Sequence, residues 1–196
     1  MTSFVAEDLR GTRRQLNPTV GVDKETVMNE LKWLDEYSGQ TTDELIALEG
    51  EHRTDSLVLA FEQALDQKAD RVGKAGLSEE ELVVLAVEAL EREVNNGGYD
   101  QFFINSSNEY ASIVVDALNR IGCTETAKLT KEAIDILGIE GPITVEAIDR
   151  VMEKENEERD EKLGECDDRY YEMAGDLAGP LLEFIKSNKD KITLKD

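Results

Sequence analysis

Carboxylates are almost the only side chains in this sequence that could do chemistry. Asp and Glu number 44, against a single histidine, His52, and two cysteines. A Ser-His-Asp or Cys-His enzyme would have His52 as its one candidate base, and no nucleophile is marked out near it. The stretch Glu49-Gly50-Glu51-His52-Arg53 is typical of a solvated helix start. The pattern therefore favours a non-catalytic protein, with an unrecognised enzyme as an alternative.

Motifs that hold cofactors or metals do not occur in the chain. There is no GxxxxGK[ST], no GxGxxG after a strand, no HExxH and no EF-hand loop. The run Glu165-Cys166-Asp167-Asp168 has metal-ligand residue types but is typical of a solvated face. Cys123 and Cys166 lie far apart without metal-ligand spacing, which predicts reduced thiols. We expect no cofactor and no metal.

The charge balance restricts the class of partner. The 196 residues carry a formal net charge of -22, which repels nucleic acid and anionic lipid surfaces. Plausible partners are basic: DNA-binding proteins, cationic ligands or metal ions. The alternative is that the acidic residues only keep the protein soluble. No signal peptide and no apolar run of about 18 residues is found, which predicts a soluble cytoplasmic protein without membrane contact.

Apolar residues at helical spacing and capping signals predict an all-α protein. Residues 1–22 have no sustained period and are interpreted as an N-terminal arm, and residues 23–196 as one globular domain of about eight helices. In the first half of the chain, helices are expected from Asp23 to Gly39, after the Thr41/Glu44 capping box, around Leu57 to Leu65, and from the Ser78/Glu81 capping box to Val94. In the second half they are expected over 105–122 and 124–137, from Thr144 as a long acidic helix, and from Pro180.

The most distinctive segment is EREVNNGGYDQFFINSS, residues 91–107. Its Asn-Asn-Gly-Gly run tolerates left-handed backbone conformations and predicts a helix end. Tyr99, Phe102 and Phe103 are then expected to turn back onto the core. The segment is interpreted as a demanding helix-loop-helix corner, and a ligand or partner pocket remains the alternative.

The same segment resembles the E..VNNGG..Q.F.NSS signature of a widespread bacterial family. The matching residues are Glu91, Val94, Asn95 to Gly98, Gln101, Phe103 and Asn105 to Ser107. That family is an acidic, all-helical domain of largely unknown function, named after a protein that mimics DNA. The resemblance extends over about residues 25–190 and implies a homodimer as well as a DNA-mimic role.

Acidic residues concentrate in the segment 140–176, which holds 14 acids and five bases. Asp149, Glu153, Glu157 and Glu161 recur every four residues, and Glu165 continues the row if a helix persists through Gly164. On a helix this spacing is about 6 Å, comparable to the phosphate separation along one DNA strand. The candidate partner-binding residues are Asp149, Glu153, Glu157, Asp160, Glu161, Glu165 and Asp168.

These observations predict a non-catalytic protein-binding module that does not bind nucleic acid itself. The resemblance and the acidic row favour a DNA mimic that occupies the DNA-binding face of a regulator or other basic protein. Pairs such as Glu146–Arg150, Glu155–Arg159 and Glu158–Lys162 leave open that the segment is only a solvated, partly paired helix. A further alternative is a domain that binds another partner through apolar surface.

Overall fold

Two capping boxes begin helices where the sequence predicts them. Thr41 Oγ1 accepts the Glu44 N–H at 3.3 Å, and the Glu44 carboxylate accepts the Thr41 N–H at 2.7 Å. Ser78 and Glu81 make the same reciprocal pair, at 3.1 and 2.9 Å. Each box satisfies backbone donors that a helix start otherwise leaves without partners.

The computed structural model describes residues 31–173 and 176–195. Within them the chain forms eight α-helices and two 3-10 helices, and no β-strand beyond isolated bridges. The elements are α2 (Thr42–Ile46), α3 (Thr54–Val72), η1 (Lys74–Gly76), α4 (Glu79–Ile104), η2 (Ser106–Tyr110), α5 (Val114–Arg120), α6 (Thr124–Ile136), α7 (Val145–Met152), α8 (Glu157–Met173) and α9 (Ala178–Ser187). The predicted all-α class is confirmed. The predicted arm, residues 1–22, and residues 23–30 lie outside the described part.

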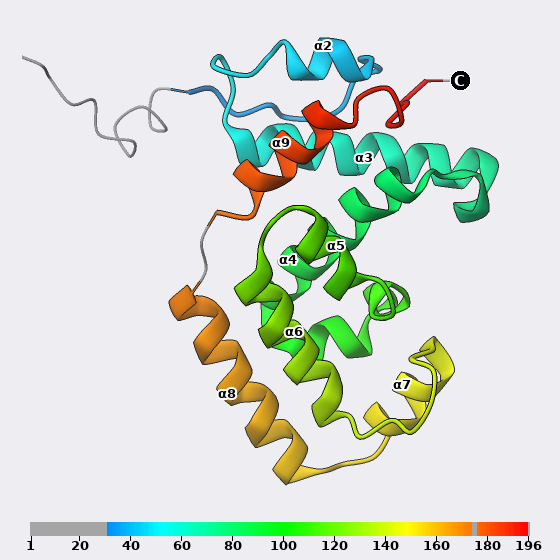
Figure 1. Ribbon diagram of the computed structural model, residues 1–196, viewed down its shortest axis with the longest axis vertical. Helices are drawn as coiled ribbons and strands as arrows, with labels where there is room; N and C mark the ends of the chain where they lie inside the picture. The colour runs from blue at the N-terminus through cyan, green and yellow to red at the C-terminus, as the bar shows by residue number, and fades with distance from the viewer. Residues whose placement is uncertain (1–30, 174–175, 196) are drawn as a thin grey trace, which may run out of the picture. The chain divides into compact units, whose positions relative to one another are not determined.

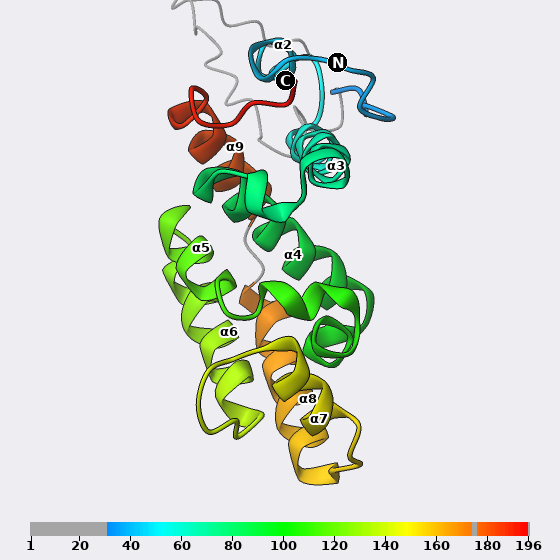
Figure 2. The same cartoon turned by 90° about the vertical axis from the view of Figure 1, so that its right-hand side faces the viewer.

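Helix α4, the longest helix of the described part, runs through the middle of the fold formed by residues 31–173 and 176–195 (Figure 1). Its buried face includes Val84, Leu85, Val87 and Leu90, all at most 1% exposed. Helices α3, α5, α7, α8 and α9 and the 3-10 helix η2 all contact α4. Helices α2, α3 and α9 lie toward one end of α4 and α6, α7 and α8 toward the other (Figures 1 and 2). One apolar core therefore supports both groups.

The C-terminal residues are tied to the start of α4 by a buried ion pair. Lys68 Nζ lies 2.8 Å from Glu81 Oε1, and both side chains are at most 9% exposed. Lys68 also donates to the Thr193 carbonyl at 2.9 Å, and Glu81 Oε1 accepts the Thr193 N–H at 2.8 Å. Because every charge here has a partner, the buried pair is compatible with the core.

The helix predicted from Asp23 to Gly39 is wrong over its described part. Residues 33–37 form no regular element, and Lys32 instead exchanges backbone hydrogen bonds with Glu51 and Arg53. Leu34 N–H donates to Ser56 Oγ at 3.1 Å and Tyr37 N–H to Gln63 Oε1 at 2.8 Å. The segment thus lies along α3, which supplies the backbone partners that a helix would have supplied internally.

Candidate functional site

Helix α8 carries most of the predicted site residues, and its buried stripe decides which of them face outward. Arg159, Leu163, Cys166 and Tyr170 recur at spacings of three and four residues and are all buried. Helix α8 contacts α4 and α6, and this stripe is therefore the side of α8 that faces the core. Residues on the opposite side of α8 therefore point away from the core.

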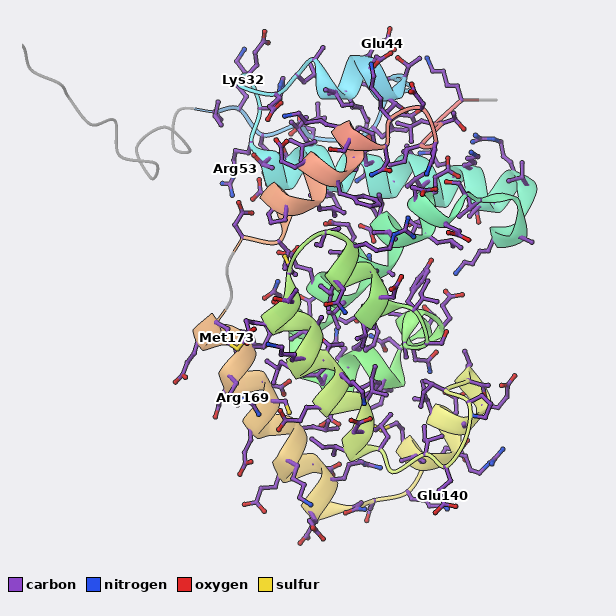
Figure 3. The ribbon with its side chains drawn as sticks, in the orientation of Figure 1. Lys32, Glu44, Arg53, Glu140, Arg169 and Met173 are labelled. Atoms are coloured by element: carbon purple, nitrogen blue, oxygen red, sulfur yellow. The ribbon has the colours of Figure 1, made fainter. Side chains whose placement is uncertain are left out.

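The outward side of α8 is a row of five exposed carboxylates. Within residues 31–173 and 176–195 none of the five makes an ion pair; they are Glu157, Glu161, Glu165, Asp168 and Glu172. Neighbours are three or four residues apart, which places them about 5 to 6 Å apart along the helix. Figure 3 shows oxygen-tipped side chains projecting from α8 on the side away from α6. We call these five residues the α8 row.

The bases of α8 do not neutralise this row. Lys162 pairs with Glu158 at 2.7 Å, and Arg169, labelled in Figure 3, pairs with Glu132 of α6 at 2.7 Å. Arg159 is 8% exposed and lies 2.7 Å from Asp160. Each of these bases makes its ion pair with a carboxylate outside the row, so none of them forms an ion pair with the α8 row.

The single long acidic helix predicted from Thr144 is wrong. The chain forms α7, whose start Thr144 Oγ1 caps by accepting the Ala147 N–H at 3.2 Å, and then the separate helix α8. The predicted row of Asp149, Glu153, Glu157 and Glu161 crosses this break, so it is not one helical face. Helix α8 does continue through Gly164, which keeps Glu165 in register with Glu157 and Glu161.

Arg159 accounts for the break between the two helices. Its Nη1 donates to the carbonyls of Val151 at 2.7 Å and Lys154 at 3.0 Å, which lie at the end of α7. Asn156 Oδ1 accepts the Arg159 N–H at 3.1 Å and so caps the start of α8. The guanidinium of Arg159 thus satisfies carbonyls at the end of α7, while the backbone of Arg159 lies in the first turn of α8.

The seven predicted site residues are all exposed, but they do not form one array. Asp149 accepts a hydrogen bond from Asn108 Nδ2 at 2.9 Å, and Asp160 accepts from Arg159. Glu153 is the C-cap residue of α7. The other four, Glu157, Glu161, Glu165 and Asp168, belong to the α8 row. Glu172 was missed, although its position four residues after Asp168 could have indicated it.

The Asn-Asn-Gly-Gly corner is confirmed as a break within α4. Gly97 and Gly98 have non-helical backbone angles, and Gly98 has a φ of +79°. A Cβ built on Gly98 would lie 2.1 Å from Asp167 Oδ2 of α8. The Asp167 carboxylate uses that space to accept the Tyr99 N–H at 2.7 Å, and so caps the helical turns that follow. The aromatic segment from Tyr99 to Ile104, which was expected to form a turn, is helical.

The polar residues of the signature converge on one carboxylate that sequence reasoning overlooked. Glu93, 7% exposed, accepts hydrogen bonds from Gln101 Nε2 at 3.0 Å, Asn105 Nδ2 at 2.7 Å and Ser107 Oγ at 2.8 Å. These donors lower the pKa of Glu93 despite an opposing effect of burial. Three signature positions thus have a structural role. Glu93 itself stands at an unspecified position of the signature, so the signature gave no signal for this carboxylate.

The aromatic residues of the corner form its contact with α8. Tyr99, Phe102 and Phe103 are fully buried, as expected. Tyr99 lies edge-on to Tyr170 at 6.0 Å between ring centroids, and its hydroxyl pairs with Thr130 Oγ1 at 2.9 Å. Tyr171 Oη donates to the Val94 carbonyl at 2.6 Å, at the end of the first part of α4. The corner therefore anchors α8 and fixes the direction of its outward row.

Two carboxyl groups of α4 are held in an unfavourable environment. Burial, followed by the nearby Glu91 carboxylate, raises the pKa of Glu88 well above its usual value. Burial, and next the Asp176 carboxylate, raises the pKa of Glu91 to about 7. Glu88 Oε1 is buried without a hydrogen-bond partner. These groups therefore favour the protonated state more strongly than an exposed glutamate does.

In the described part of the chain, the candidate catalytic and metal-binding side chains lie apart from one another. His52 is half-buried just before α3, and its Nδ1 has no partner. Cys123 and Cys166 are free thiols, consistent with the prediction. No group of three or more His, Cys, Asp and Glu within residues 31–173 and 176–195 could hold a metal ion. In the run 165–168 the side chains separate, because Cys166 is buried and Asp167 binds the Tyr99 N–H.

The helices of the described part include none that is both long and apolar enough to cross a membrane.

Comparison with protein families shows a similarity over much of the chain. The family model described as DMP19-like protein matches residues 75–188, more than half of the chain, from η1 to the end of α9. No curated protein and no solved structure matches. The matched range contains the signature corner and the α8 row, whereas α2 and α3 lie outside it.

Proposed function

The chain belongs to the DMP19-like family, and we propose that it is a non-catalytic DNA mimic. In this proposal the α8 row occupies the DNA-binding face of a regulator or another basic protein. The observation that carries the proposal is that five exposed carboxylates share one helical face while every base of α8 is engaged elsewhere.

Helix stability does not account for the row. Like charges three or four residues apart on a helix destabilise it by a few tenths of a kcal/mol per pair. A protein that binds DNA places Lys and Arg side chains to contact successive phosphates. Such a surface could contact carboxylates spaced about 5 to 6 Å apart and release its bound counterions, as it does on DNA.

Removing charge from the row is expected to weaken partner binding without unfolding the protein. Glu157, Glu161 and Glu165 are replaced by Gln and Asp168 by Asn, which keeps side-chain size. We expect the melting temperature to hold or rise slightly, because repulsion is relieved. Affinity for a captured basic partner should fall, and the slope of log affinity against log salt should flatten. Isothermal titration at several salt concentrations measures both.

The control removes four exposed carboxylates outside α8, by changing Glu36, Glu51, Asp70 and Asp190 to their amides. This variant loses the same net charge, so a general effect of acidity would weaken binding equally in both. Duplex DNA should compete with the parent protein for the partner. Binding that survives the α8 changes and excess DNA would exclude mimicry by this row and favour an apolar contact, for which Ile104, 63% exposed, is a candidate.

We also propose a homodimer, as the family resemblance implies. Association through the acidic rows would be opposed by charge repulsion, so the interface should use apolar surface. Near the end of α8, Tyr171 is 49% and Met173 41% exposed, and because they lie on different sides of the helix each is a separate candidate for this contact. We expect sedimentation equilibrium at micromolar concentration to give twice the chain mass of 21.9 kDa. A mass of 21.9 kDa at every concentration would refute the dimer.

A further inference from the structure

A surface hollow lies at the Gly-Gly corner of α4, and the proposed mimicry assigns no role to it. Its volume is about 430 Å³. The residues that line it all come from the signature segment; they are Gly97, Asp100, Gln101, Ile104 and Asn105. None of these lining residues is basic, so the Asp100 carboxylate is their one charged group. The most distinctive segment of the sequence thus lines a hollow with a single negative charge.

The Asp100 carboxylate has no partner within the described part of the chain. Neither of its oxygens makes a hydrogen bond or an ion pair there, and Oδ1 is buried. Burial, followed by the Asp160 carboxylate, raises the pKa of Asp100, and the charge of Arg159 opposes this effect. Arg159 is itself engaged by Asp160 and by carbonyls at the end of α7. Asp100 therefore lacks the donor that a polar group in such a place normally has.

Glu93 fixes the orientation of the two amide side chains in the lining. Its carboxylate accepts hydrogen bonds from Gln101 Nε2 at 3.0 Å and from Asn105 Nδ2 at 2.7 Å. A carboxylate can only accept, so both amide nitrogens must face Glu93 and both amide oxygens must face elsewhere. These two oxygens accept no hydrogen bond from the described residues. The hollow is therefore rich in acceptors that have no donor.

Gly97 and Ile104 give the hollow its space and its apolar surface. A Cβ built on Gly97 would lie 2.3 Å from Gln101 Oε1, so the glycine leaves room for that oxygen beside the hollow. Ile104 is 63% exposed, the largest exposed fraction among the large apolar side chains of the described part. Acceptors beside an uncovered apolar side chain suit a group that combines N–H donors with an aliphatic stem.

We propose that this hollow binds an arginine side chain of a partner protein. The guanidinium has one positive charge and five N–H donors in a planar fork, which suit the Asp100 carboxylate and the neighbouring amide oxygens. The aliphatic stem of the arginine covers Ile104. Free arginine fits less well, because its own carboxylate would meet the Asp100 charge and no basic residue of the lining.

The hollow adds to the acidic segment a contact that the α8 row does not provide. The Asp160 carboxylate of α8 acts on Asp100, so the hollow adjoins the start of that helix. The row offers charge alone, whereas the hollow combines a charge, directed acceptors and an apolar side chain. Arginine binding at the hollow does not require that the α8 row contacts the partner.

Capped amino acids test the site on the protein alone. Acetyl-arginine amide, acetyl-citrulline amide and free arginine are titrated separately into the full chain at constant ionic strength, and backbone amide shifts are followed by NMR. Citrulline keeps the shape of arginine without its charge. We expect saturable shifts at Gly97, Asp100 and Ile104 with capped arginine, weaker binding of free arginine, and no saturation with capped citrulline. Ligands of this size bind in about the millimolar range.

Asp100→Asn keeps the side-chain shape and is expected to raise the dissociation constant of capped arginine about fivefold to tenfold, because hydrogen bonds to charged acceptors are the stronger ones. Ile104→Ala should raise it about twofold to fourfold, as uncovering about one methylene group does. The matched control is Asp70→Asn, which removes the same charge from an exposed residue of α3 outside the hollow. Binding by this control should equal that of the parent.

The proposal is overturned if no shift saturates, if capped citrulline gives the same shifts, or if free arginine binds more tightly than capped arginine. It is also overturned if Asp100→Asn and Asp70→Asn behave alike. The variant with four amide substitutions in the α8 row should bind capped arginine as the parent does, so failure of the mimicry leaves this test unaffected. A loss in that variant equal to the loss in Asp100→Asn would show general attraction to an acidic surface and would overturn the hollow as a site.

Discussion

Replacing Gly98 with alanine is expected to lower the free energy of unfolding by about 2 to 6 kcal/mol. Gly98 has a φ of +79° and a ψ of −173°, a backbone conformation that is essentially restricted to glycine and costs other residues about 1 to 3 kcal/mol. The new Cβ would also displace the Asp167 carboxylate from the Tyr99 N–H, and an unsatisfied buried donor costs about 1 to 3 kcal/mol. For a chain of this length the melting temperature should fall by about 5 to 15 °C, as measured by calorimetry.

Gly122→Ala is the matched control, since Gly122 has a φ of +86° and no atom within 4 Å of a built Cβ. The Gly122→Ala variant should lower the free energy of unfolding only by the cost of its backbone conformation. Asp167→Ala should remove most of the clash, so combining it with Gly98→Ala should cost less than the sum of the single changes. Equal losses for the two glycine variants would show that Asp167 is not involved. An unchanged melting temperature with lost partner binding would instead make the corner functional.

The protein is expected to become less stable between about pH 5 and pH 7, as Glu88 and Glu91 lose protons. The pKa of Glu91 is about 7 in the folded chain, against 4.5 as its ordinary value, with burial and then Asp176 as causes. Between these values the folded state binds more protons than the unfolded state, so the free energy of unfolding falls as pH rises. The pKa of Glu88 is raised in the same direction.

Glu91→Gln should therefore raise the free energy of unfolding at pH 8 by about 1 to 3 kcal/mol, since each pKa unit corresponds to about 1.4 kcal/mol. It should have little effect at pH 5, where the parent group is already protonated. Urea unfolding at pH 5, 6, 7 and 8 measures both. Glu165→Gln, at an exposed carboxylate of the α8 row, is the control and should show no such pH dependence. A stabilisation by Glu91→Gln that is equal at pH 5 and pH 8 would refute the proposed environment.

Signals that act over a few residues were sufficient to predict much of this protein. The two capping boxes, the apolar stripe of α4 and the break at Gly97 and Gly98 depend on neighbours within one or two helical turns, so the sequence alone contains their physical cause. The same holds for the spacing of Glu157, Glu161 and Glu165, because all three lie on one uninterrupted helix.

Contacts between distant residues decided the rest. The segment that contains Leu34 has a helical apolar stripe, yet Ser56 and Gln63 of α3 accept its backbone hydrogen bonds and the segment forms no helix. Burial of Arg159 against the end of α7 splits the acidic segment, so Asp149 and Glu153 leave the row. The periodicity of apolar and charged residues indicates which residues could share a helical face. Only tertiary packing determines where the helix ends and which side of it is covered.

The pairing of residues across the fold has no signal in a single sequence. Asp167, which accepts the Tyr99 N–H, is 68 residues away from Tyr99 in the sequence. Glu93 differs from the other acids because the fold brings Gln101, Asn105 and Ser107 within hydrogen-bond distance of its carboxylate. The sequence by itself determined that the protein is helical, acidic and broken at the Gly-Gly corner. Only the tertiary structure decided which carboxylates are buried, which have partners, and which form the outward row, because burial and neighbouring charge are properties of the packed chain.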